Sequence, residues 1–442
     1  MHRTLLSLSL VLAGIAGAVP VHVPPSSSSV RLLGRTHTQS PGSLQWSWSG
    51  SGAMVAFSGT SCSVHLQARG GIFRVVVDGV ERAPLDLSSS TDTLHALATG
   101  LAAGPHVVEI RQKTEAQNCT SRFRGFRIEG TPATLPEPPT RRIEFYGNSI
   151  TCGYGILDSM ASSPFSVKTE DEGRTFAAQA AQALGAERRT VCWSGKGVVQ
   201  NYNRDTLNPT LPKLYQQILP WNAQDLWDFS GWTPQAVVVN LGTNDFSHVA
   251  PDSVKFHRTY AAFVDSLHAR YPQAKFVLVD GPMLSDGYPA GVNALSKLRR
   301  HLDNIAAEIA VRGIAATRLS LTPQGNLGYG ADYHPNLAQA ALNGQELASH
   351  LRTAMGWTTN SAVGLEPPRP RAALERSAQD LSVRISDGET ADARIVDLRG
   401  RSTWNRKLSS GSHELPASAG GGWLVLRFQG AVQVLAIRPD LR

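Results

Sequence analysis

Hydrophobic and polar positions alternate along the first third of the chain, between residues 31 and 130. Short alternating runs, as in strands with one buried face, lie at 53–57, 63–66, 72–77, 106–111 and 123–128. Gly- and Ser-rich turns separate them, and Asp78-Gly79 is a strong hairpin signal. Helical periodicity is missing from this stretch, so we predict a β-sandwich (jelly-roll) domain.

The pattern changes at residue 141, after a Pro-rich linker over residues 131–140. Hydrophobic runs without alternation, typical of strands covered on both faces, lie at 143–146, 236–241 and 276–280, with weaker ones at 190–193 and 317–321. Helical stretches lie between them at 175–184, 253–270 and 292–311. We therefore predict an α/β domain over 141–357 with a parallel, doubly wound sheet, whose functional residues gather at the carboxyl ends of the strands.

Both ends of the chain carry further signals. Arg3 precedes an apolar stretch over 5–18 that ends in Ala-Gly-Ala, which predicts a signal peptide over residues 1–18 and an exported protein. This stretch is shorter than the ~20 residues that span a bilayer, so we expect no stable membrane insertion. After a linker at 358–379, alternating runs return at 381–385, 393–398, 423–428 and 432–437, which predict a small all-β module over 380–442, interpreted as a sandwich.

Composition narrows the classes of function. The chain has 442 residues, of which 41% are hydrophobic and 17% charged, and this excludes a wholly disordered chain. The formal charge of +7 comes from scattered basic residues, so we interpret it as solubility and predict no nucleic-acid partner. His and Cys do not cluster at metal-ligand spacing, and no HExxH pair occurs, so we predict neither a metal nor another cofactor.

Export would place the four Cys in an oxidising compartment, where two disulfides can form. The sequence permits three pairings. We favour Cys62–Cys119 together with Cys152–Cys192, because each pair then stays within one predicted domain. Four buried free thiols are the alternative.

Three polar segments lie where the α/β domain is expected to expose its chemistry. Ser149, in the turn GNSIT after the first strand, would place its hydroxyl and N–H at a helix start, where negative charge is favoured. Asn244, in GTND after the strand at 236–241, can offer its side-chain amide to an oxyanion. His334, in DYHPN before the last helix, can take the Ser proton. Each segment alone has an ordinary structural interpretation, but together they predict a hydrolase.

The three segments resemble the sequence blocks of the SGNH (GDSL-type) hydrolase superfamily. The resemblance implies Ser149 as the nucleophile and His334 as the general base. It also implies an oxyanion hole made by the N–H of Ser149, the side chain of Asn244 and a Gly amide in the segment WSGKG, for which Gly195 is our first choice over Gly197.

More narrowly, GNSITCGYG, SGKG, GTND and YHPN look like carbohydrate esterase family 2, which pairs an N-terminal jelly roll with an SGNH domain. The resemblance covers residues 31–356. It implies removal of acetyl groups from plant cell-wall polysaccharides such as xylan and glucomannan, with acetylated poly- or oligosaccharides as the binding partner. The C-terminal module faintly resembles secretion-sorting β-domains of gliding and fibre-degrading bacteria, which implies secretion machinery as its partner.

One position departs from the superfamily pattern. The triad Asp usually lies three residues before the His, where this chain has Ala331. Asp332 is one residue closer, where the chain direction would point its side chain elsewhere. Some members of the narrower family work with a Ser–His dyad and orient the imidazole with a backbone carbonyl or another group. We therefore predict a dyad, with Asp332 as a secondary orienting candidate.

Aromatic residues in the loops of the α/β domain are candidates for stacking on sugar rings. Tyr154 and Trp193 are the substrate-binding candidates, and Trp221, Trp227 and Trp232 fall in similar loops. Partial burial is the ordinary interpretation of each.

Two alternative functions stay open. A secreted lipase or lysophospholipase on the same scaffold would need a long apolar lid, whereas these loops are polar and Gly-rich. A non-catalytic carbohydrate-binding protein would contain a relict hydrolase, which Ala331 favours slightly. The intact Ser149, Asn244 and His334 argue against it.

Overall fold

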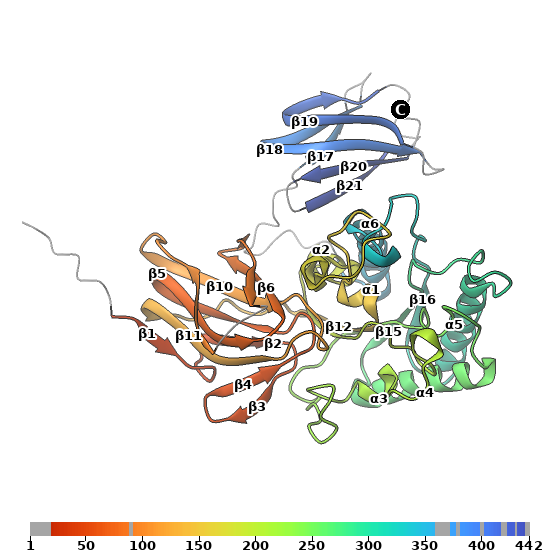
Figure 1. Ribbon diagram of the computed structural model, residues 1–442, viewed down its shortest axis with the longest axis horizontal. Helices are drawn as coiled ribbons and strands as arrows, with labels where there is room; N and C mark the ends of the chain where they lie inside the picture. The colour runs from red at the N-terminus through yellow and green to blue at the C-terminus, as the bar shows by residue number, and fades with distance from the viewer. Residues whose placement is uncertain are drawn as a thin grey trace, which may run out of the picture.

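The computed structural model describes residues 19–87, 92–358, 372–376, 381–397, 402–416, 422–428 and 431–437. These residues form an N-terminal β-domain, a central α/β domain and a C-terminal β-module, in the predicted order (Figure 1). The expected signal peptide at 1–18 and most of the linker at 358–379 lie outside the described residues. In the described part of the chain, no helix has the length and hydropathy needed to cross a membrane.

Hydrogen bonds join the eleven N-terminal strands into one sheet that encloses a hydrophobic core. The strands are β1 (Val21–Val23), β2 (Val30–Leu33), β3 (His37–Ser40), β4 (Ser43–Trp46), β5 (Gly52–Ala68), β6 (Gly71–Val77), β7 (Val80–Glu81), β8 (Leu85–Leu87), β9 (Thr93–Ala98), β10 (Gly104–Gln112) and β11 (Ser121–Pro132). The first part of β5 pairs with β2 and β10, and the second part pairs with β9. Between these parts Gly59 faces β11 so closely that a Cβ would lie 2.0 Å from the Glu129 carbonyl oxygen. The predicted runs at 53–57 and 63–66 are therefore one strand shared by both layers of the sandwich.

The α/β domain contains five parallel strands in the order β13-β12-β14-β15-β16. They are β12 (Arg141–Gly147), β13 (Ala186–Cys192), β14 (Ala236–Asn240), β15 (Lys275–Val279) and β16 (Ala316–Leu319). Every residue of β14 is buried, as its continuous hydrophobic run predicts. The chain runs outward from β12 in both directions, which is the predicted doubly wound arrangement, and ligands bind where the strand order reverses in such sheets.

Helices cover both faces of this sheet. Helices α2 and α6 pack against the face that carries Phe145, Val238 and Val277, whereas α4 and α5 pack against the opposite face. The helices are α1 (Ser149–Cys152), α2 (Phe176–Ala183), α3 (Leu211–Leu214), α4 (Ser253–Arg270), α5 (Ala294–Val311) and α6 (Leu337–Met355), with short 3-10 helices η1 (Val167–Thr169), η2 (Glu172–Arg174), η3 (Tyr202–Arg204) and η4 (Ala331–Tyr333). The predicted helices at 175–184, 253–270 and 292–311 are thus confirmed as α2, α4 and α5.

The C-terminal module is one five-stranded sheet in the residues described there. Its strands are β17 (Ala372–Arg376), β18 (Leu381–Asp397), β19 (Ser402–Glu414), β20 (Gly422–Phe428) and β21 (Ala431–Ile437). The runs at 381–385 and 393–398 are two ends of β18, which pairs with β17 through one end and with β20 through the other. Strand β19 follows β18 along both parts, so the described strands form one hydrogen-bonded sheet, as in the N-terminal domain, and the sandwich arrangement stays a prediction.

Only one of the two predicted disulfides is present. Cys152 and Cys192 are bonded, whereas Cys62 and Cys119 are buried free thiols, so the prediction for the second pair is wrong. Ser121, close to Cys119, pairs with Ala68, six residues along β5 from Cys62. At about 3.3 Å per residue this is about 20 Å, well beyond the ~7 Å between Cα atoms that a disulfide can span.

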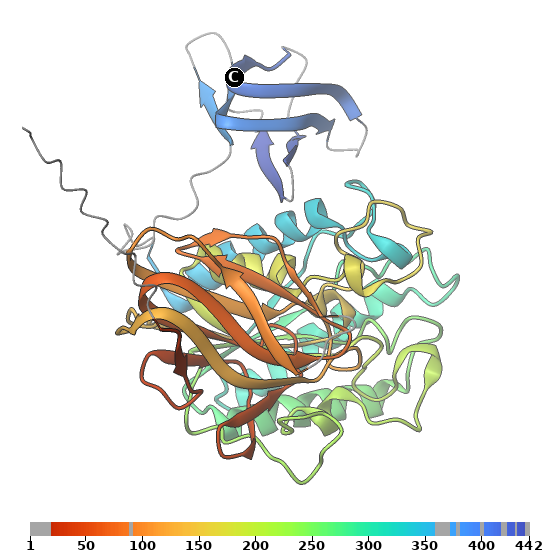
Figure 2. The same cartoon turned by 60° about the vertical axis from the view of Figure 1, so that its left-hand side comes forward.

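The N-terminal strands lie against the α/β domain (Figure 2). A buried arginine joins the two domains. Arg35 follows β2 and is 1% exposed. Its guanidinium donates to the carbonyl oxygens of Tyr215 and Gln217, and to the Glu144 carboxylate at 3.1 Å. A cation from one domain is therefore neutralised inside the other.

Candidate active site

The predicted site segments lie at neighbouring carboxyl ends of the parallel strands. Ser149 follows β12 at the start of α1, Gly195 lies in the loop after β13, and Asn244 lies in the loop after β14. His334 follows η4 and precedes α6. Because the ends of parallel strands meet at one edge of the sheet, residues far apart in sequence approach the same space.

Ser149 is held in a tight turn between β12 and α1. The Asn148 side-chain oxygen accepts the Ile150 N–H at 3.1 Å and caps the helix. Gly147 cannot carry a side chain, because a Cβ there would lie 2.0 Å from Thr151 Oγ1. The Ser149 N–H lies in the first turn of α1, where it has no intrahelical acceptor and stays available to an oxyanion.

The His334 imidazole is oriented by a backbone carbonyl. Its Nδ1 lies 2.9 Å from the Asp332 carbonyl oxygen, so Nδ1 carries the proton and Nε2 is the basic nitrogen. The ring is buried, and burial lowers the pKa of His334 to about 4, although the hydrogen bond and the charge of Asp332 act in the opposite direction. The imidazole is therefore neutral near pH 7, as a general base must be.

The Asp332 side chain points to Tyr154 and not to the imidazole. The Tyr154 hydroxyl donates to Asp332 Oδ2 at 3.3 Å, and the Tyr154 ring lies over the His334 ring with 4.2 Å between centroids. Asp332 has a φ of 49°, a left-handed conformation that turns its carbonyl toward Nδ1. A backbone carbonyl thus lies against the ring, as in the predicted Ser–His dyad, whereas the Asp332 carboxylate, the secondary orienting candidate, contacts Tyr154 instead.

Asn244 and the loop after β13 face one another. Asn244 Nδ2 donates one hydrogen to the Lys196 carbonyl oxygen at 2.9 Å, and an amide nitrogen has a second hydrogen to offer. The Gly197 N–H is already engaged, because it donates to Asn201 Oδ1 at 3.2 Å. This occupied N–H favours Gly195 over Gly197 as the backbone donor of an oxyanion hole.

Asp245 ties the two loops together. Its buried carboxylate accepts the N–H groups of Val198, Val199 and Gln200 at 2.8–3.1 Å. Burial raises the pKa of Asp245 to about 6, although these hydrogen bonds act in the opposite direction. The segment GTND alone assigns Asp245 no role, because a local motif does not reveal which backbone groups a side chain will meet.

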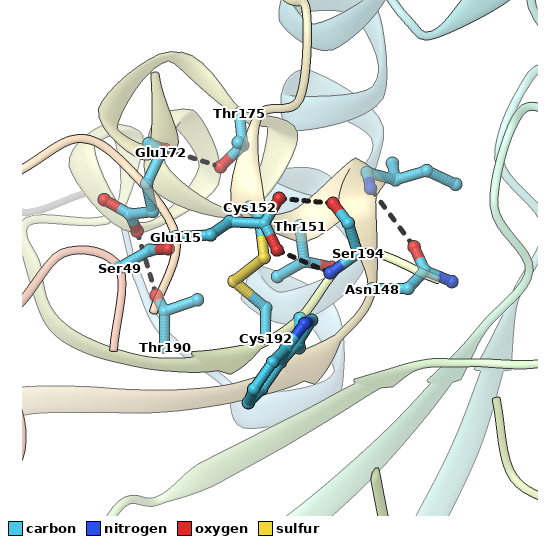
Figure 3. The surroundings of a disulfide bond; sticks show 12 residues. Ser49, Glu115, Asn148, Thr151, Cys152, Glu172, Thr175, Thr190, Cys192 and Ser194 are labelled. Atoms are coloured by element: carbon cyan, nitrogen blue, oxygen red, sulfur yellow. Dashed lines mark hydrogen bonds between the residues drawn. A yellow bond between two sulfur atoms is a disulfide. The ribbon is translucent and has the colours of Figure 1, made fainter. Parts of the chain in front are cut away.

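The disulfide also lies beside the site. Cys152 is the last residue of α1 and Cys192 is the last residue of β13, so the bond joins the Ser149 helix to the strand that leads into the Gly195 loop (Figure 3). The same loop contacts the N-terminal domain, because both the N–H and the hydroxyl of Ser194 donate to Glu115. Glu115 is a site residue that sequence reasoning missed, since no local pattern links it to residue 194.

The other aromatic candidates occupy different environments. Trp193 is half-buried and its Nε1 donates to Gln117 of the N-terminal domain at 2.7 Å. Trp227 and Trp232 enclose the Arg189 guanidinium, with ring centroids 5.0 and 4.3 Å from it. Trp221 is 51% exposed. Tyr154 is the only one of these five aromatic side chains with a ring contact to His334 in the described structure.

A small cavity borders Ser149. Ile150, Phe176 and Pro282 give it an apolar lining, and Pro335, directly after His334, also lines it. The serine and histidine segments therefore border one space. Among the described residues, no three His, Cys, Asp or Glu side chains are grouped so that they could hold a metal ion.

Two family models match the chain: carbohydrate esterase 2 N-terminal over residues 32–138 and GDSL-like lipase/acylhydrolase over residues 145–342. The cellulase/esterase CelE of Acetivibrio thermocellus is 33% identical over 328 residues, which are 73% of this chain but 39% of that relative's length. An acetylxylan esterase / glucomannan deacetylase of Cellvibrio japonicus is 28% identical over 341 residues, 76% of this chain and 91% of the relative.

Solved structures agree with these matches. A family two carbohydrate esterase from Clostridium thermocellum, in complex with cellohexaose, has a TM-score of 0.70 and 32% identity, covering 74% of this chain and 100% of that chain. A family two carbohydrate esterase from Cellvibrio japonicus has a TM-score of 0.69 and 26% identity, covering 77% of this chain and 99% of that chain. Both domains of the fold, the site segments and the matched lengths lead to one assignment: the chain belongs to carbohydrate esterase family 2.

Proposed function

We propose that the protein is an exported esterase that removes O-acetyl groups from plant cell-wall polysaccharides such as xylan and glucomannan. The observation that carries the chemistry is the His334 ring, whose Nδ1 lies 2.9 Å from the Asp332 carbonyl oxygen, which leaves Nε2 to act as the base. The substrate class rests on relatives named acetylxylan esterase / glucomannan deacetylase. Export rests on the signal-peptide pattern at residues 1–18.

Acylation starts when His334 Nε2 removes the proton of the Ser149 hydroxyl as its oxygen attacks the acetyl carbonyl carbon. The tetrahedral intermediate collapses, the bond from carbon to the sugar oxygen breaks, and the imidazolium gives its proton to that oxygen. Water then attacks the acetyl-Ser149 ester with His334 again as the base. Acetate leaves and the Ser149 hydroxyl is restored.

The oxyanion of each intermediate is held by three donors: the N–H of Ser149, the N–H of Gly195 and the side-chain amide of Asn244. Removal of one such donor typically costs ~2.7–4 kcal/mol of transition-state stabilisation. The hydrogen bond from Asn244 to the Lys196 carbonyl fixes the amide before substrate arrives, so little reorganisation is needed during the reaction.

The cavity beside Ser149 is small and has apolar residues in its lining, which supports a short acyl group. An acetyl group needs room for only one methyl, whereas a long fatty acyl chain needs an extended apolar groove.

The test is acetate release from acetylated xylan and acetylated glucomannan by the wild type, Ser149→Ala and His334→Ala. The variants should lose at least ~10³-fold in kcat, since nucleophile and base act as a unit. Ser266→Ala, on the exposed side of α4, is the matched control and should keep full activity. A wild type that releases no more acetate than Ser149→Ala would disprove the proposal, and faster cleavage of 4-nitrophenyl octanoate than of the acetate would favour the lipase alternative.

A further inference from the structure

Glu115 reaches from the N-terminal domain into the loop that carries Gly195. It lies between β10 and β11 and is completely buried. Its Oε2 accepts the Ser194 N–H at 2.5 Å and its Oε1 accepts the Ser194 hydroxyl (Figure 3). Both donors of Ser194 are thus fixed by one carboxylate from another domain.

The turn that Glu115 holds has a specific geometry. The Lys196 N–H donates to the Trp193 carbonyl oxygen at 3.2 Å, and Gly195 has a φ of 78°. These are features of a type II turn, in which the central peptide, here Ser194–Gly195, is flipped relative to a type I turn. The direction of the Gly195 N–H therefore depends on this form being kept. Glu115 restrains it on one side, and the Tyr202 N–H, 2.7 Å from the Gly195 carbonyl oxygen, restrains it on the other.

A second buried carboxyl supports Glu115 from the α/β domain. Glu170 Oε2 accepts the Glu115 N–H at 3.1 Å and the Asn118 side-chain amide at 3.2 Å. Burial, followed by the charge of Glu115, raises the pKa of Glu170 well above its ordinary value. Burial also raises the pKa of Glu115, but Glu170 and the donors of Ser194 oppose that shift. Of the two carboxyls, Glu115 is the one that faces Ser194 and accepts both of its donors.

We propose that Glu115 is a positioning residue for ester hydrolysis: its carboxylate, supplied by the N-terminal domain, aims the Gly195 N–H at the oxyanion. This inference rests on the proposed esterase function. It gives the N-terminal domain a part in the chemical step in addition to any contact with polysaccharide. An oxyanion donor acts mainly in the transition state, so loss of Glu115 lowers kcat while KM changes little.

The experiment compares Glu115→Ala and Glu115→Gln with the wild type in 4-nitrophenyl acetate hydrolysis. Glu115→Ala lowers kcat about 10–100-fold and changes KM less than about twofold. This loss of kcat is a large part of what removal of a whole oxyanion donor costs. Glu115→Gln is intermediate, because its amide oxygen still accepts the Ser194 N–H. The matched control is Glu81→Gln, in the same domain: its ion pairs with Arg74 and Arg174 lie outside the 193–196 turn, and kcat stays within about twofold.

Near-UV circular dichroism establishes which variants are folded. Folded Glu115→Ala with wild-type kcat, or with a change confined to KM, overturns the inference. If Glu115→Ala does not fold, Glu115→Gln decides, and a wild-type kcat in that variant overturns it equally.

A serine-reactive phosphonate ester separates this inference from the proposed substrate, because its phosphoryl oxygen occupies the oxyanion hole when Ser149 displaces the leaving group. If the wild type releases no acetate from polysaccharide but Ser149 is labelled, the substrate proposal fails. If labelling is then slower in Glu115→Ala than in Glu81→Gln, the role of Glu115 stands. Equal labelling rates overturn the role of Glu115. A wild type that neither cleaves acetyl esters nor is labelled overturns both.

Discussion

The environment of His334 determines the pH range in which the site can work. Burial lowers the pKa of its imidazole to about 4, and the reactive form is the neutral base. The proton is therefore lost as the pH rises through about 4, and kcat/KM for acetyl ester hydrolysis should be flat from about pH 5 to neutral. Rates of acetate release between pH 3 and 8, with circular dichroism at each pH to confirm folding, measure this. An inflection near the ordinary His value of ~6.5 would contradict it.

Asp332 contributes a carbonyl oxygen to the imidazole and a carboxylate to Tyr154. Asp332→Asn retains the carbonyl, and Asn tolerates the left-handed φ of 49° better than most residues. We expect kcat/KM to fall less than about 10-fold, in contrast to the ~10⁴-fold loss of kcat in a Ser protease whose triad Asp was replaced by Asn. Steady-state kinetics of Asp332→Asn and His334→Ala, measured in parallel, test this. A loss of kcat/KM as large in Asp332→Asn as in His334→Ala would show that the carboxylate itself orients the ring.

At the scale of elements, the disulfide fastens α1 to the end of β13. The two cysteines are 40 residues apart, and a loop of that length predicts a stabilisation of about 2–4 kcal/mol. The double variant Cys152→Ala/Cys192→Ala should lower the free energy of unfolding by this amount in urea titrations. Thiol titration of the denatured, unreduced wild type should find two free groups, Cys62 and Cys119. Finding none would mean that these two cysteines are paired after all.

The sequence predicts the helices and strands better than it predicts the contacts between them. The run Val237–Val239 predicts a strand buried on both faces, because consecutive residues point to opposite faces and all three are hydrophobic. Glu115 and Ser194 have no such local signal, since their contact depends on how two domains dock. The same limit explains Cys62 and Cys119: their shared domain suggested a bond, but the register of β5 and β11 sets their distance.

At the scale of the molecule, buried polar contacts join the N-terminal and α/β domains. Arg35 and Glu144 are 1% and 0% exposed at the side chain, and Tyr146 also donates to Glu144 at 2.7 Å. Loss of either charge would leave the other inside the protein without its partner, so neither domain can separate at low cost. The same docking brings Glu115 to Ser194, which makes the stability of this interface a condition for the arrangement of the site.

Arg35→Ala should therefore reduce the stability of both domains together. We expect the free energy of unfolding to fall by about 3–5 kcal/mol, the usual cost when one partner of a buried pair is removed. Urea unfolding followed by tryptophan fluorescence and far-UV circular dichroism should give one shared, lowered midpoint. The double variant Arg35→Met/Glu144→Gln leaves no unpaired charge, so it should lose less than the sum of the single variants. Two separate transitions, with the α/β domain as stable as in the wild type, would show that the domains fold independently and that Arg35 does not couple them.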